Sequence, residues 1–580
     1  MKKKNSELLL AIKDASSDLG KKTMTLFWVL SAARILVGLL DVLGVFCLGL
    51  FSAQALNQTE NTVTNFGGLR GIGTSPLTLL GLALVLLTVK SCLSYILNYY
   101  LIGVMNDRCS KVIYAKSSLI CDSDIEILNR FSTQKLHFLL TAGLRASTLG
   151  ILMPLSVIMV EGFLVTVFFI YLLVTNVLAA LLAFAILGIT SMLLHRFLAK
   201  RQYRNGQLAG SAGIRSLSSF QDAIHGYKEL LVNGNLAAAI KRFSSIESET
   251  GSIQTRQTIL GVLPRHVLES AVMVTLGSIA MISSLLGKSE SAIVLLTIFG
   301  AAAARILPSL VPLQTSLAEI QVNLGKASEV SAIGDLGGKS KRIFANLGGQ
   351  LESNQSQLSV RFASVIYRYP EAMLNAVEEL TFEFSGPGWY AIDGPSGSGK
   401  STIFDILMGV SKPQFGHVTI NGVDPWTYIQ TNPGYCSYLP QRISVFNSSI
   451  AENVAFGQVI EQIDISRVIT LLELVGLEEL AKRLKSNPLE PIGEMADNVS
   501  GGQLQRLGIA RCMYTKPSIF LFDESTSGLD SVSQKSILDL IEDLSRTCMV
   551  ISISHDHRIS DRASQIVRIE TGRVQRIEVK

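Results

Sequence analysis

The stretch GPSGSGKST, residues 394–402, decides the fold of the C-terminal part of this 580-residue chain. It matches the pattern G-x-x-x-x-G-K-[ST] and lies between WYAID, which predicts a strand, and TIFDILMGV, which predicts a helix. This is the context of a phosphate-binding loop, in which backbone N–H groups and a helix N-terminus converge on phosphate oxygens. Lys400 would neutralise the β- and γ-phosphates, and the Ser401 hydroxyl would ligate Mg²⁺. The predicted cradle consists of Gly394, Pro395, Ser396, Gly397, Ser398, Gly399, Lys400, Ser401 and Thr402.

A second motif, SIFLFDES at 518–525, is an apolar run that predicts a buried strand ending in Asp523 and Glu524. Asp523 suits the Mg²⁺ shell, and Glu524 is placed to polarise an attacking water. Two solvated acids at the end of a strand are common in isolation. Their combination with a phosphate-binding loop favours the catalytic interpretation.

Between these motifs lies VSGGQLQRLGIARCM, which contains Ser500, Gly501, Gly502 and Gln503. A glycine pair followed by a helix makes a second phosphate-cradling N-terminus. One nucleotide site cannot easily use two such elements from one chain. We therefore expect the second cradle to serve a nucleotide bound to another copy.

Residues 358–580 resemble the nucleotide-binding domain of an ABC transporter, whose signature is SGGQ. The resemblance implies ATP and Mg²⁺ as cofactors. Tyr369 in YRYP matches the aromatic residue that stacks on adenine, and Asp530 ends the matching SGLD loop. Gln441 in YLPQ matches a residue that touches Mg²⁺ and senses the membrane domain, and His555 in SISHD matches the histidine that contacts the γ-phosphate. The implied catalytic residues are Glu524, His555, Gln441 and Lys400, and the implied metal ligands are Ser401, Gln441 and Asp523.

The family pattern has small departures here. Val499 stands for the leading Leu of the signature, Gly528 for an Ala in the SGLD loop, and Ala496 for the second Gly of the exporter-type coupling segment. All matched catalytic positions are intact, which implies two equivalent active sites in a homodimer.

The first 330 residues are much more apolar than the rest and predict a polytopic helical membrane domain. A bilayer core requires about 20 mostly apolar residues per helix. The third and fourth runs are nearly continuous and need a tight turn at 175–176. The six predicted spans are 24–53, 77–104, 147–174, 177–195, 260–286 and 291–313.

Lysine and arginine are concentrated in residues 2–22, 105–146 and 196–259, and they are scarce in the alternate connections. This bias places both termini and the nucleotide-binding domain in the cytoplasm. The basic N-terminus predicts an interfacial helix rather than a signal peptide. The two long basic connections predict helical extensions of the spans. A net charge of +5 does not indicate a nucleic-acid partner, and seven scattered cysteines without a C-x-x-C pair indicate reduced thiols.

The boundaries predicted from these patterns are a membrane domain at 1–330, a Gly- and Ser-rich linker at 331–357 and a nucleotide-binding domain at 358–580. Six spans ahead of one such domain resemble an ABC exporter half-transporter of type IV. The resemblance implies a multi-pass cell-membrane protein, in bacteria the inner membrane, that works as a homodimer with alternating access.

Seven charged residues fall within the predicted spans, where charge is costly and is by default a functional hypothesis. They are Arg34, Asp41, Lys90, Glu161, Arg265, Glu269 and Arg305. Arg265 and Glu269 can pair along one helix face. The candidate substrate contacts are Arg265, Arg305, Arg34 and Lys90, which could meet an anionic group. Pairing between helices, or anchoring at helix ends, is the plainer alternative.

PRHVLE (264–269) and ARILPSL (304–310) are similar to stretches of bacterial flippases for lipid-linked oligosaccharides. That resemblance implies an anionic lipid-linked glycan as substrate and membrane lipid as a partner. An exporter of a peptide, a siderophore or another amphipathic molecule remains open, and so does a drug or lipid A exporter. The spans argue against a soluble ABC ATPase of DNA repair or translation, and intact Glu524 and His555 argue against an ABC-type regulator.

Overall fold

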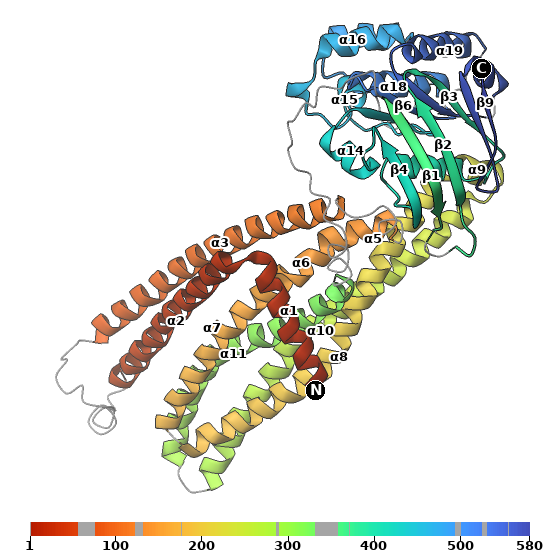
Figure 1. Cartoon of the computed structure of the whole chain (residues 1–580). Helices are drawn as coiled ribbons and strands as arrows, with labels where there is room; N and C mark the ends of the chain where they lie inside the picture. Colours follow the sequence, from red (N-terminus) through yellow and green to blue (C-terminus); the bar gives the residue numbers. More distant parts are fainter. Residues whose placement is uncertain are drawn as a thin grey trace. The chain divides into compact units, whose positions relative to one another are not determined.

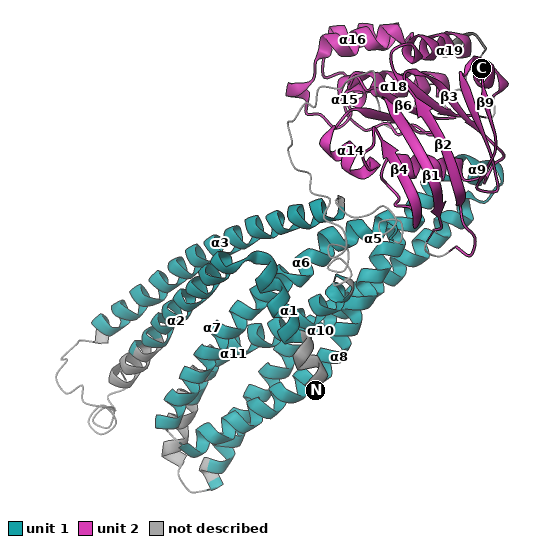
Figure 2. Ribbon diagram, in the orientation of Figure 1, with its two compact units in different colours: residues 1–123, 127–341 teal, residues 124–126, 342–580 magenta. Residues whose placement is uncertain are grey.

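The chain folds into two compact units in this computed structural model, residues 1–123 with 127–341 and residues 124–126 with 342–580 (Figure 2). The structure describes residues 2–55, 76–121, 131–175, 177–285, 289–330, 358–369, 372–492, 500–524, 531–554 and 556–580. The predicted linker, most of the coupling segment, Asp530 and His555 lie outside these ranges.

Unit 1 is helical, and its long helices run side by side (Figure 1). Helix α2 packs on α3, α8 packs on α10, and α11 packs on α7, α8 and α10. The helices are α1 (Lys2–Leu19), α2 (Lys21–Ala55), α3 (Pro76–Cys121), α5 (Thr133–Phe138), the π-helix η2 (Leu139–Gly143), α6 (Leu144–Ser147), α7 (Leu149–Thr175), α8 (Val177–His225), α9 (Tyr227–Val232), α10 (Leu236–Leu285), α11 (Ser289–Lys326) and the 3₁₀ turn η3 (Ala327–Glu329).

Within the described part of the chain, five helical segments are long and apolar enough to cross a membrane. They correspond to the first five predicted spans and are Lys21–Gly44, Leu77–Ile120, Thr133–Val174, Val177–His225 and Leu236–Ile282. The sixth predicted span, 291–313, falls within α11, but the side chains of 290–298 are outside the described residues. The expected helical extensions are present, because α3 continues to Cys121 and α8 to His225.

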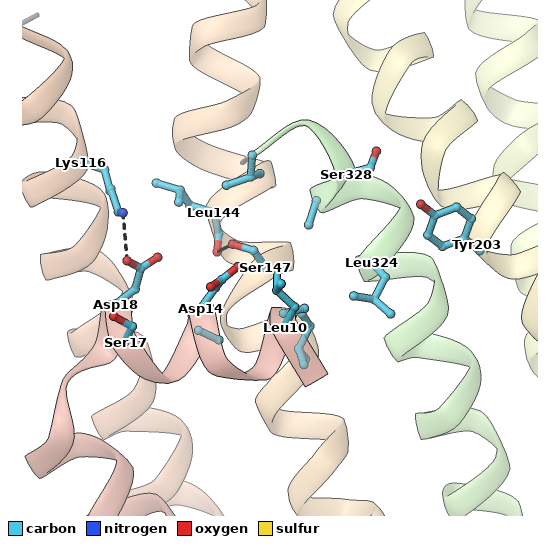
Figure 3. Close-up of a pocket in the computed structure, with 15 residues that line it drawn as sticks. Leu10, Asp14, Ser17, Asp18, Lys116, Leu144, Ser147, Tyr203, Leu324 and Ser328 are labelled. Carbon is cyan, nitrogen blue, oxygen red and sulfur yellow. Dashed lines mark hydrogen bonds and ion pairs between the residues drawn. The ribbon is translucent and has the colours of Figure 1, made fainter. Parts of the chain in front are cut away.

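Helix α1 lies against the other helices of unit 1 and borders a cavity of about 560 Å³ (Figure 3). The wall is mostly apolar, with Leu144 and Leu324 opposite α1. Asp18 of α1 forms an ion pair of 2.9 Å with Lys116 of α3 across its edge. The expected N-terminal helix is therefore docked by both apolar contact and charge.

Unit 2 contains two sheets. The larger has the strand order β5-β6-β7-β3-β8-β9, parallel except for β9, and the smaller antiparallel sheet has the order β2-β1-β4. The strands are β1 (Ser359–Tyr367), β2 (Val377–Ser385), β3 (Gly388–Asp393), β4 (Phe415–Ile420), β5 (Cys436–Leu439), β6 (Ile519–Asp523), β7 (Met549–Ile553), β8 (Gln565–Glu570) and β9 (Arg573–Val579).

The helices of unit 2 connect these strands. They are α13 (Lys400–Leu407), α14 (Pro425–Thr431), α15 (Ile450–Val454), the 3₁₀ turn η5 (Ile460–Gln462), α16 (Ile465–Leu474), α17 (Glu478–Ser486), α18 (Gly501–Tyr514), α19 (Ser531–Ser545) and α20 (His557–Arg562). The central strand β7 is buried along its whole length. A sheet covered on both faces explains the continuous apolar runs of β6 and β7, which lack an alternating pattern.

Candidate functional site

The loop 394–399 joins the end of β3 to the start of α13, as the sequence predicts. Gly399 is the N-cap of α13 and has a φ of 97°, a conformation that L side chains rarely adopt. A Cβ at Gly399 would collide with the Ala376 carbonyl oxygen, and one at Gly394 would collide with that of Ile569. Both glycines are therefore required for the loop to close.

Lys400 lies in the first turn of α13 with its ammonium group folded back over the loop. Its Nζ donates to the carbonyl oxygens of Gly394, at 2.6 Å, and Pro395, at 2.9 Å. Burial lowers the pKa of Lys400, while the nearby acids Glu524, Asp393 and Asp523 act against that shift. The loop thus holds a buried cation that faces the acidic end of β6.

Asp523 ends β6, and Glu524 follows it with a φ of 48°. This backbone conformation is uncommon outside glycine and is often found at functional sites. The Glu524 N–H donates to the Ile553 carbonyl oxygen at 2.9 Å, which ties the turn to β7. The strained turn thus holds Glu524 at the end of the sheet.

The two acids have different surroundings. Gln441 Nε2 donates to a Glu524 carboxylate oxygen at 2.6 Å, and the Tyr438 hydroxyl donates to Asp523 at 3.3 Å. Burial raises the pKa of Asp523, and Tyr438 and Lys400 partly offset the increase. The edge of the sheet thus brings together a proton acceptor, Glu524, an amide that orients it, Gln441, and a cation, Lys400.

Helix α18 begins at the SGGQ motif with a complete capping box. The Ser500 Oγ accepts from the Gln503 N–H at 3.3 Å, and the Gln503 side chain accepts from the Ser500 N–H at 2.8 Å. Nothing lies within 4 Å of a Cβ built on Gly501. The first turn of α18 is therefore rigid and open, as an anion-binding helix N-terminus requires.

Sequence reasoning missed a residue that connects α18 to the segment after Gln441. Arg511 donates to the carbonyl oxygens of Asn453, at 2.9 Å, and Ser444, at 3.1 Å, and lies over the Phe456 ring. Asn453 is fully buried and exchanges two hydrogen bonds of 2.9 Å with the Phe446 backbone. The IARC sequence that holds Arg511 predicts only a helix.

The residues of the site fit a bound nucleotide and metal. Ser398 Oγ is buried at the loop and has no hydrogen-bond partner among the described residues. The Tyr369 hydroxyl is 3.1 Å from that of Thr402, so the predicted adenine-stacking residue adjoins the loop. No cluster of three or more His, Cys, Asp or Glu that could bind a metal occurs in the described ranges. The set Ser401, Gln441 and Asp523 suits Mg²⁺ that keeps water and phosphate ligands.

The charged residues of unit 1 find partners that sequence spacing did not predict. Lys90 of α3 forms an ion pair of 3.3 Å with Asp41 of α2. Arg34 of α2 donates to the Ser156 hydroxyl of α7 at 2.8 Å.

The expected pair along α10 is present, with Arg265 and Glu269 at 2.9 Å. The side chain of Arg305, on α11, is outside the described residues. In the described part of unit 1, the candidate substrate contacts are thus engaged by polar groups of the chain itself.

Residues 377–527 match the family model described as ABC transporter. Similar curated proteins include the ATP-dependent lipid A-core flippases of Burkholderia orbicola, 27% identical over 61% of this chain and 58% of the relative, and of Cupriavidus metallidurans, 29% identical over 61% and 59%. An export ATP-binding/permease protein of Rickettsia felis is 30% identical over 38% of each chain. The matches thus span less than two thirds of these relatives.

Among solved structures, a bacterial Atm1-family ABC exporter with ATP bound has a TM-score of 0.74, with 19% identity and coverage of 96% of both chains. This similarity extends over the helical region as well as the nucleotide site. Residues 377–527 are thus an ABC transporter domain, and the whole chain has the fold of an ABC exporter, in which a region of long apolar helices precedes the ATPase domain.

Proposed function

We propose that this protein hydrolyses ATP to move an anionic lipid-linked oligosaccharide across a membrane, as a homodimer with alternating access. The observation that carries the ATPase part is the convergence of Lys400, Gln441 and Glu524 at the edge of the large sheet. The apolar helices of unit 1 support the transport part.

In this proposal, the loop 394–402 and Tyr369 hold ATP, and Ser401, Gln441 and Asp523 hold Mg²⁺. Bound MgATP supplies the phosphoanhydride whose hydrolysis provides free energy. Glu524 accepts a proton from the attacking water, and Gln441 orients its carboxylate. Lys400 neutralises charge on the phosphates. His555 and Asp530 remain proposed contacts to the nucleotide from the family resemblance.

The SGGQ element supports the proposal of a second copy. Ser500, Gly501, Gly502 and Gln503 present a capped, open helix N-terminus, and the phosphate-binding loop already has the N-terminus of α13. If two copies face each other, each nucleotide contacts the phosphate-binding loop of one copy and the SGGQ element of the other. The lysine and arginine bias supports a cytoplasmic location for both termini and for unit 2. We propose that the helices of unit 1 span a bacterial inner membrane.

The substrate class rests on charge and on the relatives. The names of two similar proteins state a lipid A-core as cargo. Arg265 has a side chain that is 67% exposed although it pairs with Glu269, so it remains accessible to a ligand. We propose Arg265 and Arg305 as contacts for the phosphate groups of the glycolipid. Lys90 is a further cation, but it forms an ion pair with Asp41.

A reconstitution experiment tests the proposed cargo. The purified protein in proteoliposomes should show ATPase stimulation and outward movement with a polyprenyl-pyrophosphate-linked glycan, and no response to a short amphipathic peptide or a siderophore. Arg265→Ala should lose transport while keeping basal ATPase. If only the peptide or the siderophore stimulates the ATPase, that molecule is the cargo and the glycolipid is not. The ATPase assignment would still hold.

A further inference from the structure

A polar group in the middle of unit 1 is unlike the other charged pairs of the helices. Ser31, Arg34, Gly38 and Asp41 are spaced by three or four residues and therefore share one face of α2. A Cβ on Gly38 would lie 3.1 Å from Leu164 of α7, so this face is packed closely against α7. Arg34 lies roughly 20 Å along the helix axis from Lys21, well inside the apolar segment.

The Arg34 guanidinium is bound by one serine hydroxyl, which a second serine hydroxyl contacts in turn. Its Nη1 donates to Ser156 Oγ at 2.8 Å, and Ser156 Oγ lies 3.0 Å from Ser31 Oγ. Both serines are fully buried. A guanidinium has five N–H donors, and one of them is used in this hydrogen bond.

The charge of Glu161 on α7 acts on Arg34, but the two form no ion pair in the described part of unit 1. Glu161 accepts a hydrogen bond from Ser309 of α11 instead and interacts electrostatically with Arg34 and Lys90. This differs from Lys90 and Asp41, which are in contact at 3.3 Å. Arg34 is thus a fixed cation, neighboured by an acid that is engaged elsewhere.

We propose that Arg34, with the hydroxyls of Ser31 and Ser156, forms a phosphate-binding subsite between α2 and α7, and that Glu161 competes with the phosphate for Arg34. Arginine binds phosphate with two parallel N–H donors, and a serine hydroxyl can add a third. The inference rests on the proposed function, because it names where the phosphate of an anionic substrate binds. The ligand chemistry is a phosphate ester, which a lipid headgroup or a soluble phosphate could supply.

The test uses the full-length protein in nanodiscs and counts bound phosphatidic acid by native mass spectrometry, with diacylglycerol of the same acyl chains as the uncharged comparison. Arg34→Ala should weaken binding of phosphatidic acid by about tenfold or more, since it removes charge-assisted hydrogen bonds. Arg34→Lys should retain part of the binding. Binding of diacylglycerol should not change.

Glu161→Gln distinguishes a binding site from a structural contact. Gln can still accept the Ser309 hydrogen bond but carries no charge, so binding of phosphatidic acid should become several-fold tighter. Arg215→Ala is the matched control, because Arg215 forms an exposed ion pair of 2.9 Å with Glu249, and it should bind like wild type. Weaker binding in Glu161→Gln, or unchanged binding in a folded Arg34→Ala protein, would overturn the subsite.

Inorganic phosphate added to the same samples identifies the source of the ligand. Displacement of phosphatidic acid shows that soluble phosphate reaches Arg34, and retention shows that the ligand enters from the bilayer; either result supports the subsite. If wild-type ATPase fails to respond to any phosphate-bearing lipid, the proposed cargo fails. If wild type responds and both variants respond equally well, only the subsite fails.

Discussion

In unit 2 the charged side chains converge on one edge of a sheet, whereas in unit 1 they are spread over several helices and engaged by partners on neighbouring helices. Lys400 points back onto its own loop and interacts electrostatically with Asp523 and Glu524. Lys90 reaches Asp41 on α2, and Arg34 reaches Ser156 on α7. The arrangement in unit 2 brings charged groups together at a site where a reaction can occur. The arrangement in unit 1 gives Lys90 and Arg34 polar partners, which lowers the cost of placing charge among apolar helices.

The largest expected effect comes from removing the cation of unit 2. Lys400→Ala should lower the ATPase rate by roughly 100-fold or more, because a preorganised donor to the phosphates is lost. The rate is measured by phosphate release from the detergent-purified protein. Fold integrity is checked separately by thermal melting. A normal rate in a folded Lys400→Ala protein would contradict the role given to the loop.

The motifs of unit 2 are local, which is why the sequence could identify them. GPSGSGKST contains its own strand, loop and helix, and the glycines at 394 and 399 are explained by single backbone contacts. The contact between Gln441 and Glu524 joins residues far apart in the chain, and only the family resemblance could suggest it. The anchoring of the segment after Gln441 by Arg511 was not predicted, because a lone arginine in a helix has no distinctive pattern.

Unit 1 shows the opposite limit of prediction. Apolar runs gave the helices and their approximate bounds, because the length of a span is set by the bilayer. They could not give the partners of Lys90 and Arg34, since hydropathy does not determine which faces of two helices meet. The pair Arg265–Glu269 was predicted because its spacing of four residues is local to one helix.

The next largest effect tests the compensation of charge in unit 1. Lys90→Met should lower stability by about 3 kcal/mol, because Asp41 loses its lysine while remaining 8% exposed. The double change with Asp41→Asn should recover most of this loss, as measured by thermal melting in nanodiscs. Lys111→Met is the control, because it breaks an exposed pair with Asp107 and should cost under about 1 kcal/mol. Equal losses in all three proteins would contradict the compensated arrangement.

A smaller effect compares two capping boxes of unit 2. Ser500→Ala and Ser449→Ala should each lower stability by about 1 kcal/mol, because each removes an N-cap hydroxyl. Only Ser500→Ala should also slow ATP hydrolysis per folded molecule, since Ser449 caps α15 rather than the signature helix. Similar ATPase rates for the two variants would contradict the proposal that the SGGQ element contacts the nucleotide.

The smallest effect concerns the protonation of Asp523. Burial raises the pKa of Asp523 above its ordinary value, so the folded protein binds this proton more tightly than the unfolded chain. The resulting stabilisation is present at low pH and is lost as pH rises through the folded pKa. Asp523→Asn should therefore give a small rise in melting temperature at pH 7 without nucleotide, and the rise should vanish toward acidic pH. A decrease at pH 7 would show that the ionised carboxylate is stabilising.

The central claim, that unit 2 hydrolyses ATP through Glu524, is tested most directly by Glu524→Gln. The side chain keeps its size and its contact with Gln441, but it can no longer accept a proton from water. The account predicts that this variant binds ATP as tightly as wild type, measured with a fluorescent analogue, while phosphate release falls at least about 100-fold. Wild-type turnover in a folded Glu524→Gln protein would contradict the account.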